Sequence, residues 1–258
     1  MPRNIQRISA YLTPNLIHEI IDAIQTEPEK KGKVGKVKRH AHGVRDKLFL
    51  RTMWETGGRV SEVSHLIKRN INLRENSITI HNLKQEKRKP LTKVVNEKIV
   101  FDLDEKGHKK FNEQITPPTK TQILSEKSTL CTDLIEYCKQ NNIVGDDDYV
   151  FYGNTNKKKP LNSIYIWKLL CGEKGISRQL GIVRAKRSKG TKERHGESGN
   201  RPAWPHTFRH SRAQLILKET GKVEIVKEHM GHANLETTKE YFVVDDEMKK
   251  KELGGMTE

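Results

Sequence analysis

The sequence predicts a mainly α-helical domain with a small antiparallel β-sheet, an α+β fold. Three observations favour it: several stretches carry apolar residues at helical spacing, two short stretches are typical of strands, and no repeat of fixed period is present. The 258 residues suit one large domain or two small ones, and the hydrophobic fraction of 33% allows one modest core. We expect a single domain over 1–258, with its core at about 11–245 and a C-terminal tail at 246–258.

The first helix is expected at residues 11–24, where apolar residues recur on one helical face. Thr13 is a suitable N-cap, and Pro14 suits the first turn because a helix leaves that N–H unpaired. Further helices are expected at about 46–56, 59–67, 129–141, 161–181 and, as two or three helices, within 206–252.

Two strands are expected at 77–80 and at about 89–95, with the segment LKQEKRK forming the turn of a hairpin between them. Residues 96–128 show weak periodicity and contain Pro117-Pro118, so the sequence predicts mostly irregular structure there.

The formal net charge of +16 is the most informative part of the composition. Such an excess attracts polyanions, and nucleic acid is favoured over a membrane because no basic amphipathic helix stands out. The alternative is a charge that only confers solubility. Two basic loops are expected, at 30–47 and 184–201. The candidate DNA-contacting cations in these loops and in the hairpin turn are Lys36, Lys38, Arg39, Lys87, Arg88, Arg184, Lys186, Arg187 and Lys189.

Cys131, Cys138 and Cys171 are sparse, odd in number and without C-x-x-C spacing, which is typical of reduced core cysteines in a cytoplasmic protein. The N-terminal residues lack the apolar segment of a signal peptide. No stretch approaches the ~18–20 apolar residues of a membrane span. We therefore expect a cytoplasmic protein without a membrane partner, bound to the nucleoid when it binds DNA.

Three places concentrate groups that could handle a phosphodiester. In TGGRVSEV, Arg59 follows a glycine bend at a helix start, where a guanidinium and backbone N–H groups can face an anion. The hairpin turn holds Lys84 among other cations. In the third place, His206 and Arg209 lie three residues apart on a helix, and His232 precedes Tyr241 by nine residues. Residues three positions apart on a helix lie on the same face, so the side chains of His206 and Arg209 are neighbours.

The run from Pro205 to Phe242 resembles the C-terminal signature of the tyrosine recombinases, the phage-integrase or Xer-like family. That signature reads H-x-x-R, then L-G-H, then T-T-x-x-Y, and Met230 stands here where leucine is usual. TGGRVSEV resembles the family's T-G-x-R-x-x-E segment, and the hairpin lysine of relatives corresponds to Lys84. The resemblance covers most of residues 11–245 and implies the fold of a tyrosine-recombinase catalytic domain.

The resemblance also implies a reaction, the cutting and rejoining of DNA through a 3′-phosphotyrosine on Tyr241. A phenol with a pKa near 10 needs help in losing its proton, and the growing charge on phosphorus needs neutralising. The resemblance assigns this help to Arg59 and Arg209 as phosphate clamps, to His206 and His232 as proton-transfer or phosphate partners, and to Lys84 as general acid. Glu62 corresponds to an acid that orients the site in relatives. The scheme requires no metal and no cofactor.

Each residue also has a plain structural interpretation. Glu62 could be a helix-surface acid, and three of the four cations at the hairpin turn could only touch DNA backbone. His206 and His210 have the i, i+4 spacing of metal ligands, but Thr207 stands where the zincin pattern requires Glu. We therefore expect no metal site, and we expect His210 and His229 to be structural or exposed.

In relatives, four copies assemble on two DNA sites, so the resemblance implies double-stranded DNA and a homotetramer on DNA, with an accessory DNA-bending protein as a further candidate partner. Relatives commonly carry an N-terminal core-binding domain, and none is evident here. Two other functions remain open: a type IB topoisomerase, and a catalytically silent DNA-binding regulator derived from a recombinase.

Overall fold

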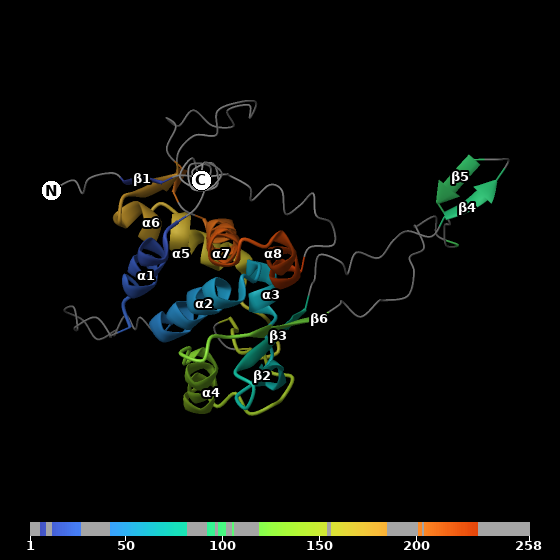
Figure 1. Ribbon diagram of the computed structural model, residues 1–258. Coiled ribbons are helices and arrows are strands. Elements are labelled where there is room, and N and C mark those ends of the chain that lie inside the picture. The colour runs from blue at the N-terminus through green and yellow to red at the C-terminus, as the bar shows by residue number, and fades with distance from the viewer. Residues whose placement is uncertain are drawn as a thin grey trace, which may run out of the picture.

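The computed structural model describes residues 6–8, 12–26, 42–81, 92–95, 98–101, 105, 119–153, 156–184, 201–202 and 204–231. In this part of the chain the predicted fold class is confirmed, because helices dominate and a small antiparallel sheet accompanies them (Figure 1). The helices are α1 (Pro14–Asp22), α2 (Gly43–Thr56), α3 (Val60–Ser64), a 3-10 turn η1 (Lys68–Asn70), α4 (Leu130–Gln140), α5 (Ser163–Cys171), α6 (Ile176–Gln179), α7 (Pro205–Thr220) and α8 (Val223–Met230).

The described strands form three separate sheets. The first is antiparallel in the order β2–β3–β6, the second has the order β1–β7–β8 with β1 parallel to β7, and the third pairs β4 with β5. The strands are β1 (Gln6–Ile8), β2 (Ile71–Asn72), β3 (Ser77–His81), β4 (Thr92–Val95), β5 (Lys98–Phe101), β6 (Thr119–Ile123), β7 (Ile182–Arg184) and β8 (Arg201–Pro202).

The hairpin predicted from the strands at 77–80 and 89–95 is wrong. β3 pairs with β6, in a register that runs from Ser77 opposite Ile123 to His81 opposite Thr119. β4 exists but pairs with β5, which follows it after only two residues, so local pairing closes a much shorter loop. Residues 96–128, which were expected to be mostly irregular, contain two strands that the sequence did not predict, β5 and β6.

The first helix follows its predicted signals. The Thr13 hydroxyl accepts a hydrogen bond from the Leu16 N–H at 3.4 Å, and Pro14 is the first helical residue. Its buried face carries Ile17, Ile20 and Ile21, which belong to the main core. The caps and the apolar periodicity together set where this helix begins and which face it buries.

Helix α2 lies at the centre of the fold and contacts α1, α3, α4 and α7 (Figure 1). Phe49 is fully buried on it and meets Phe151 edge to face, with ring centroids 5.0 Å apart. The helix begins three residues before its predicted start. Arg45 therefore lies in a helix and not in a basic loop. It is buried there, and its guanidinium donates to the Asp46 carboxylate at 2.9 Å.

Two other helices are shorter than predicted. α3 has five residues, because Ile67 forms an isolated bridge with Tyr149 instead of continuing the helix. The helix predicted at 161–181 is divided into α5 and α6, since the chain leaves the helical conformation at Gly172.

Cys131, Cys138 and Cys171 are buried and free, and burial raises the pKa of each thiol to about 11.

No helix in the described ranges is long and apolar enough to span a bilayer. Among the same residues, no three His, Cys, Asp or Glu side chains gather as metal ligands would.

Gly57 ends α2 in the left-handed region, with φ at +61°, and an added Cβ would lie 2.8 Å from Met230 Cε. We expect Gly57→Ala to lower the free energy of unfolding by about 1–3 kcal/mol, mainly because it strains a left-handed backbone, while the end of the flexible Met230 side chain must also move. Chemical denaturation measures the loss. Gly221→Ala is the matched control, since Gly221 has φ at +66° but nothing within 4 Å of an added Cβ. An equal loss in both variants would show that the contact with Met230 is unimportant.

Candidate active site

The bend after α2 places Arg59 and Glu62 at the start of α3. Glu62 is buried, with a relative accessibility of 1%. Its carboxylate accepts the Arg59 backbone N–H at 2.9 Å and the Arg59 guanidinium at 2.5 Å. The interpretation of Glu62 as a helix-surface acid is therefore wrong. Its carboxylate is buried, and its two hydrogen bonds from Arg59 hold Arg59 in place.

Arg209 lies in α7 and is also buried, with a relative accessibility of 1%. Its two terminal nitrogens donate to the Gly57 carbonyl at 2.6 Å and to the Met230 carbonyl at 2.5 Å. Nη1 lies 3.9 Å from the Glu62 carboxylate. One side chain thus joins the bend before α3 to the C-terminus of α8, and its guanidinium has a fixed orientation.

A lysine that was not predicted completes this group. Lys120 lies on β6, and its ammonium donates to the His229 carbonyl at 3.2 Å. Burial and the charge of Arg209 lower the pKa of Lys120 to about 7, while Glu62 partly opposes the shift and Arg59 adds to it. We call Arg59, Glu62, Lys120 and Arg209 the charged cluster.

The charges in the cluster determine the state of Glu62. Burial alone would raise the pKa of its carboxyl group. The hydrogen bond from the Arg59 backbone and the charges of Lys120, Arg209 and Arg59 outweigh burial, so the pKa is lowered. Glu62 is therefore ionised at neutral pH and balances part of the positive charge around it.

The C-terminus of α8 is anchored on the cluster. Gln122 donates to the same His229 carbonyl at 2.9 Å, so that two β6 side chains and Arg209 occupy carbonyls that a helix end leaves unpaired. Burial and the neighbouring cations Arg212, Lys120 and Arg209 lower the pKa of His229 to about 3. The predicted structural role of His229 agrees with a ring that stays neutral at this helix end.

His206 is in the first turn of α7 and is exposed, whereas Arg209 one turn later is buried. Its ring meets that of His210 edge to face, with centroids 5.5 Å apart. Helix α7 thus carries both residues, with Arg209 buried in the cluster and His206 exposed three residues earlier.

Lys84, His232 and Tyr241 lie outside the described residues. His232 follows Gly231, which ends α8 in the left-handed region with φ at +62°. Among the predicted DNA contacts only Arg184 is described, as a backbone position in β7. The others, which lie outside the described ranges, are Lys36, Lys38, Arg39, Lys87, Arg88, Lys186, Arg187 and Lys189.

Sequence reasoning missed Lys120 and Gln122 because the strand that carries them was expected to be irregular. One signal was available, since three β-branched residues, Thr119, Thr121 and Ile123, recur at every second position. In the structure Ile123 is 78% exposed and Gln122 is 4% exposed, as the period of a strand requires.

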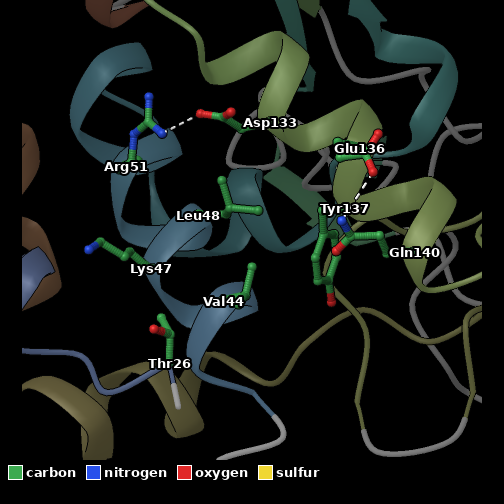
Figure 2. A pocket seen from close by; sticks show the side chains of 9 residues that line it. All are labelled: Thr26, Val44, Lys47, Leu48, Arg51, Asp133, Glu136, Tyr137 and Gln140. Atoms are coloured by element: carbon green, nitrogen blue, oxygen red, sulfur yellow. Dashed lines mark hydrogen bonds and ion pairs between the residues drawn. The ribbon is translucent and has the colours of Figure 1, made fainter.

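A pocket of about 260 Å³ lies elsewhere, between α2 and α4 (Figure 2). Arg51 and Asp133 form an ion pair at its edge, with 2.6 Å between nitrogen and oxygen. Of the candidate residues that the structure describes, neither Arg59 and Glu62 nor His206 and Arg209 line this pocket, so the charged cluster is the better candidate site. The lining residues are Thr26, Val44, Lys47, Leu48, Arg51, Asp133, Glu136, Tyr137 and Gln140.

The chain matches the phage integrase family over residues 10–248. It therefore belongs to this family, whose members are tyrosine recombinases, and the resemblance of the motifs is confirmed. Among curated proteins, a probable integrase/recombinase of Methanocaldococcus jannaschii is 25% identical over 203 residues, which cover 76% of this chain and 44% of that protein. The chain thus spans less than half the length of this relative.

Solved structures support the same fold. The XerA recombinase has a TM-score of 0.56 at 17% identity, and the match covers 100% of this chain and 67% of that one. The XerH recombinase has 0.54 at 17%, covering 96% and 53%, and the Tn1549 transposon integrase has 0.54 at 13%, covering 96% and 66%. At these identities the likeness concerns the fold alone.

Glu62→Gln is expected to lower the free energy of unfolding by about 3–5 kcal/mol at neutral pH, because it leaves neighbouring buried cations without their counter-charge. The lowered pKa of Glu62 means that its charge stabilises the fold above the ordinary value of 4.5 and that this contribution is lost as the pH falls below it. Unfolding measured from pH 7 to pH 3 should therefore show a smaller acid loss in Glu62→Gln than in the wild type.

Glu55→Gln is the matched control for this measurement. Glu55 pairs with Arg51 at 3.3 Å, and its side chain is 20% exposed. Its loss should cost no more than about 1 kcal/mol, as for other ion pairs near the surface. Equal costs for the two variants would contradict the special role of Glu62.

Proposed function

We propose that this chain is a site-specific DNA recombinase that cleaves and rejoins DNA through a 3′-phosphotyrosine on Tyr241. The observation that carries the proposal is the charged cluster, in which Arg59 and Arg209 share one buried carboxylate. Membership of the phage integrase family supports the same reaction. The positive charge of the chain, +16, suits a polyanionic substrate.

In the proposed reaction, Arg59 and Arg209 stabilise the charge that grows on the non-bridging phosphate oxygens. Their fixed orientation supports this role, since donors that need no reorganisation stabilise a transition state best. His232 hydrogen-bonds the phosphate, and His206 assists the loss of the proton from Tyr241. Glu62 orients Arg59.

Attack by the Tyr241 oxygen breaks the bond from phosphorus to the 5′ oxygen, and a lysine ammonium protonates that leaving group. The motif resemblance assigns this proton to Lys84. A 5′-hydroxyl from a partner strand then attacks the phosphotyrosine and reseals the backbone. The scheme conserves the energy of the phosphodiester in the protein linkage, and it uses no metal ion or cofactor.

The proposed partner is double-stranded DNA, with four copies of the chain on two DNA sites and an accessory DNA-bending protein as a further candidate partner. XerH and the Tn1549 integrase, which share the fold, were solved bound to DNA. We place the protein in the cytoplasm, on the nucleoid when it is bound to DNA. We also propose that the chain forms one catalytic domain with its core at about 11–245.

The test is covalent trapping on a nicked suicide duplex, in which the cleaved end loses its short strand and cannot reseal. Candidate target sites come from the DNA that flanks the gene. We expect a protein–DNA adduct that survives boiling in detergent and forms in EDTA. Tight binding without an adduct would support a silent regulator, and an adduct with plasmid relaxation but no joining of two sites would support a topoisomerase.

A further inference from the structure

The lysine that the motif resemblance selects is not the one that the charged cluster contains. Lys84 follows the end of β3, at His81, by three residues. Lys120 lies on the partner strand, and its ammonium donates to the His229 carbonyl, one residue before the Met230 carbonyl that Arg209 holds. Two different lysines are thus available for one chemical role.

Strand pairing gives Lys120 a defined position. It lies opposite Ile80 in a ladder of five residue pairs between β3 and β6. Ile80 itself is buried beside the glycine bend, since its Cδ1 would lie 3.2 Å from a Cβ added at Gly58. The strand that pairs with β6 therefore packs against the segment that carries Arg59.

The ammonium is also tied to the segment that leads to the predicted phosphate ligand His232. Its partner is the His229 carbonyl at 3.2 Å, and Gln122 on the same strand face holds that carbonyl at 2.9 Å. His229 lies three residues before His232. A group positioned by a sheet and by a helix end meets the requirement for accurate placement of a catalytic side chain.

We propose that Lys120, rather than Lys84, is the general acid that protonates the leaving 5′ oxygen. This inference rests on the proposed cleavage reaction. As the Tyr241 oxygen bonds to phosphorus, the bond from phosphorus to the 5′ oxygen breaks, and one ammonium proton of Lys120 moves to that oxygen. The products are the phosphotyrosine, a 5′-hydroxyl and a neutral Lys120 amine, which takes the proton back when the hydroxyl attacks in the resealing step.

The electrostatic surroundings support both directions of this transfer. Burial, Arg209 and Arg59 lower the pKa of Lys120 and Glu62 raises it, to a net value of about 7, while the adjacent His229 ring stays neutral. A group with a pKa near the working pH can give up a proton and recover it with similar ease. An ordinary lysine with a pKa near 10.4 is a slow donor and is seldom available as a base at neutral pH.

The experiment compares two suicide duplexes that differ in one atom. One has the normal 5′ oxygen at the cleaved bond, and the other has sulfur in its place. A thiolate leaves without being protonated, because a thiol has a pKa near 8.5. Lys120→Met should cleave the oxygen duplex about 10²–10⁴-fold more slowly than the wild type and should cleave the sulfur duplex within about tenfold of it.

Two further variants distinguish the alternatives. Lys127→Met, an exposed lysine after β6, should behave as the wild type on both duplexes. A Lys120→Met variant that is equally slow on both duplexes would overturn the proposal, because sulfur does not rescue a structural or positioning defect. Rescue by sulfur in Lys84→Met instead would also overturn it.

The wild type provides an independent measurement that needs no variant to fold. Its single-turnover rate on the oxygen duplex should fall as the pH rises above about 7, since Lys120 then loses its proton, and this fall should be absent on the sulfur duplex. The same fall on both duplexes would overturn the proposal. Absence of any adduct with the wild type would instead contradict the proposed function itself, so the two failures are distinct.

Discussion

Tyr241→Phe is expected to abolish the covalent adduct while binding to the same duplex stays within about twofold of the wild type. The substitution removes only the attacking oxygen, and nothing else in the proposed scheme can form the phosphotyrosine. Denaturing electrophoresis of the suicide-duplex reaction measures the adduct, and a mobility shift measures binding. An adduct that persists in Tyr241→Phe would contradict this choice of nucleophile.

Tyr165→Phe is the matched control for this result. The Tyr165 hydroxyl donates to the buried Asp46 carboxylate at 2.5 Å, and burial together with Asp46 raises the pKa of this phenol well above its ordinary value. A phenol held in this way is a poor nucleophile. We expect Tyr165→Phe to lose some stability and to keep the adduct, because its hydroxyl belongs to the Arg45–Asp46 pair and not to the charged cluster.

Arg209→Ala is expected to have the second-largest effect, and it acts in two ways. It slows cleavage about 10²–10³-fold, as the loss of one transition-state donor does in other enzymes. It also costs about 3–5 kcal/mol of unfolding free energy, because it removes one charge from a buried ion pair. The carbonyls of Gly57 and Met230 lose their side-chain donor at the same time. Urea denaturation and single-turnover cleavage, corrected for the folded fraction, separate the two effects.

Arg45→Ala tests whether lost stability alone explains lost cleavage. Arg45 is 3% exposed and is paired with Asp46, so its removal should be similarly destabilising. Cleavage per folded molecule should remain that of the wild type. Arg209→Lys keeps the charge without the planar fork and should still cleave about 10²-fold more slowly. If Arg45→Ala and Arg209→Ala slow cleavage equally, the assigned role of Arg209 is wrong.

The elements that the sequence predicted well are those whose signals are local. α1 and α4 begin and end within three residues of their predicted bounds, because capping and apolar periodicity act within one or two turns. The bend at Gly57 was predicted because only glycine readily adopts the left-handed conformation that ends α2 there. These features require no knowledge of what packs against them.

The candidate site was predicted in part. The spacing of the motifs identified Arg59, Glu62 and Arg209, and the structure brings all three into contact. Their burial could not be predicted, since it depends on where α7 and α8 pack. The sequence therefore allows Glu62 to be either a surface acid or a buried one, and the packing decides between them.

The sequence by itself determined the family, the order of the helices, the excess of positive charge and the residue types that the reaction needs. Only the tertiary structure decided that β3 pairs with β6 and that Lys120 joins the charged cluster. Strand pairing is a long-range choice, because the backbone hydrogen bonds of β3 are satisfied equally well by several candidate strands. Burial likewise depends on the whole fold, and it is burial among fixed charges that turns an ordinary lysine into a group with a pKa of about 7.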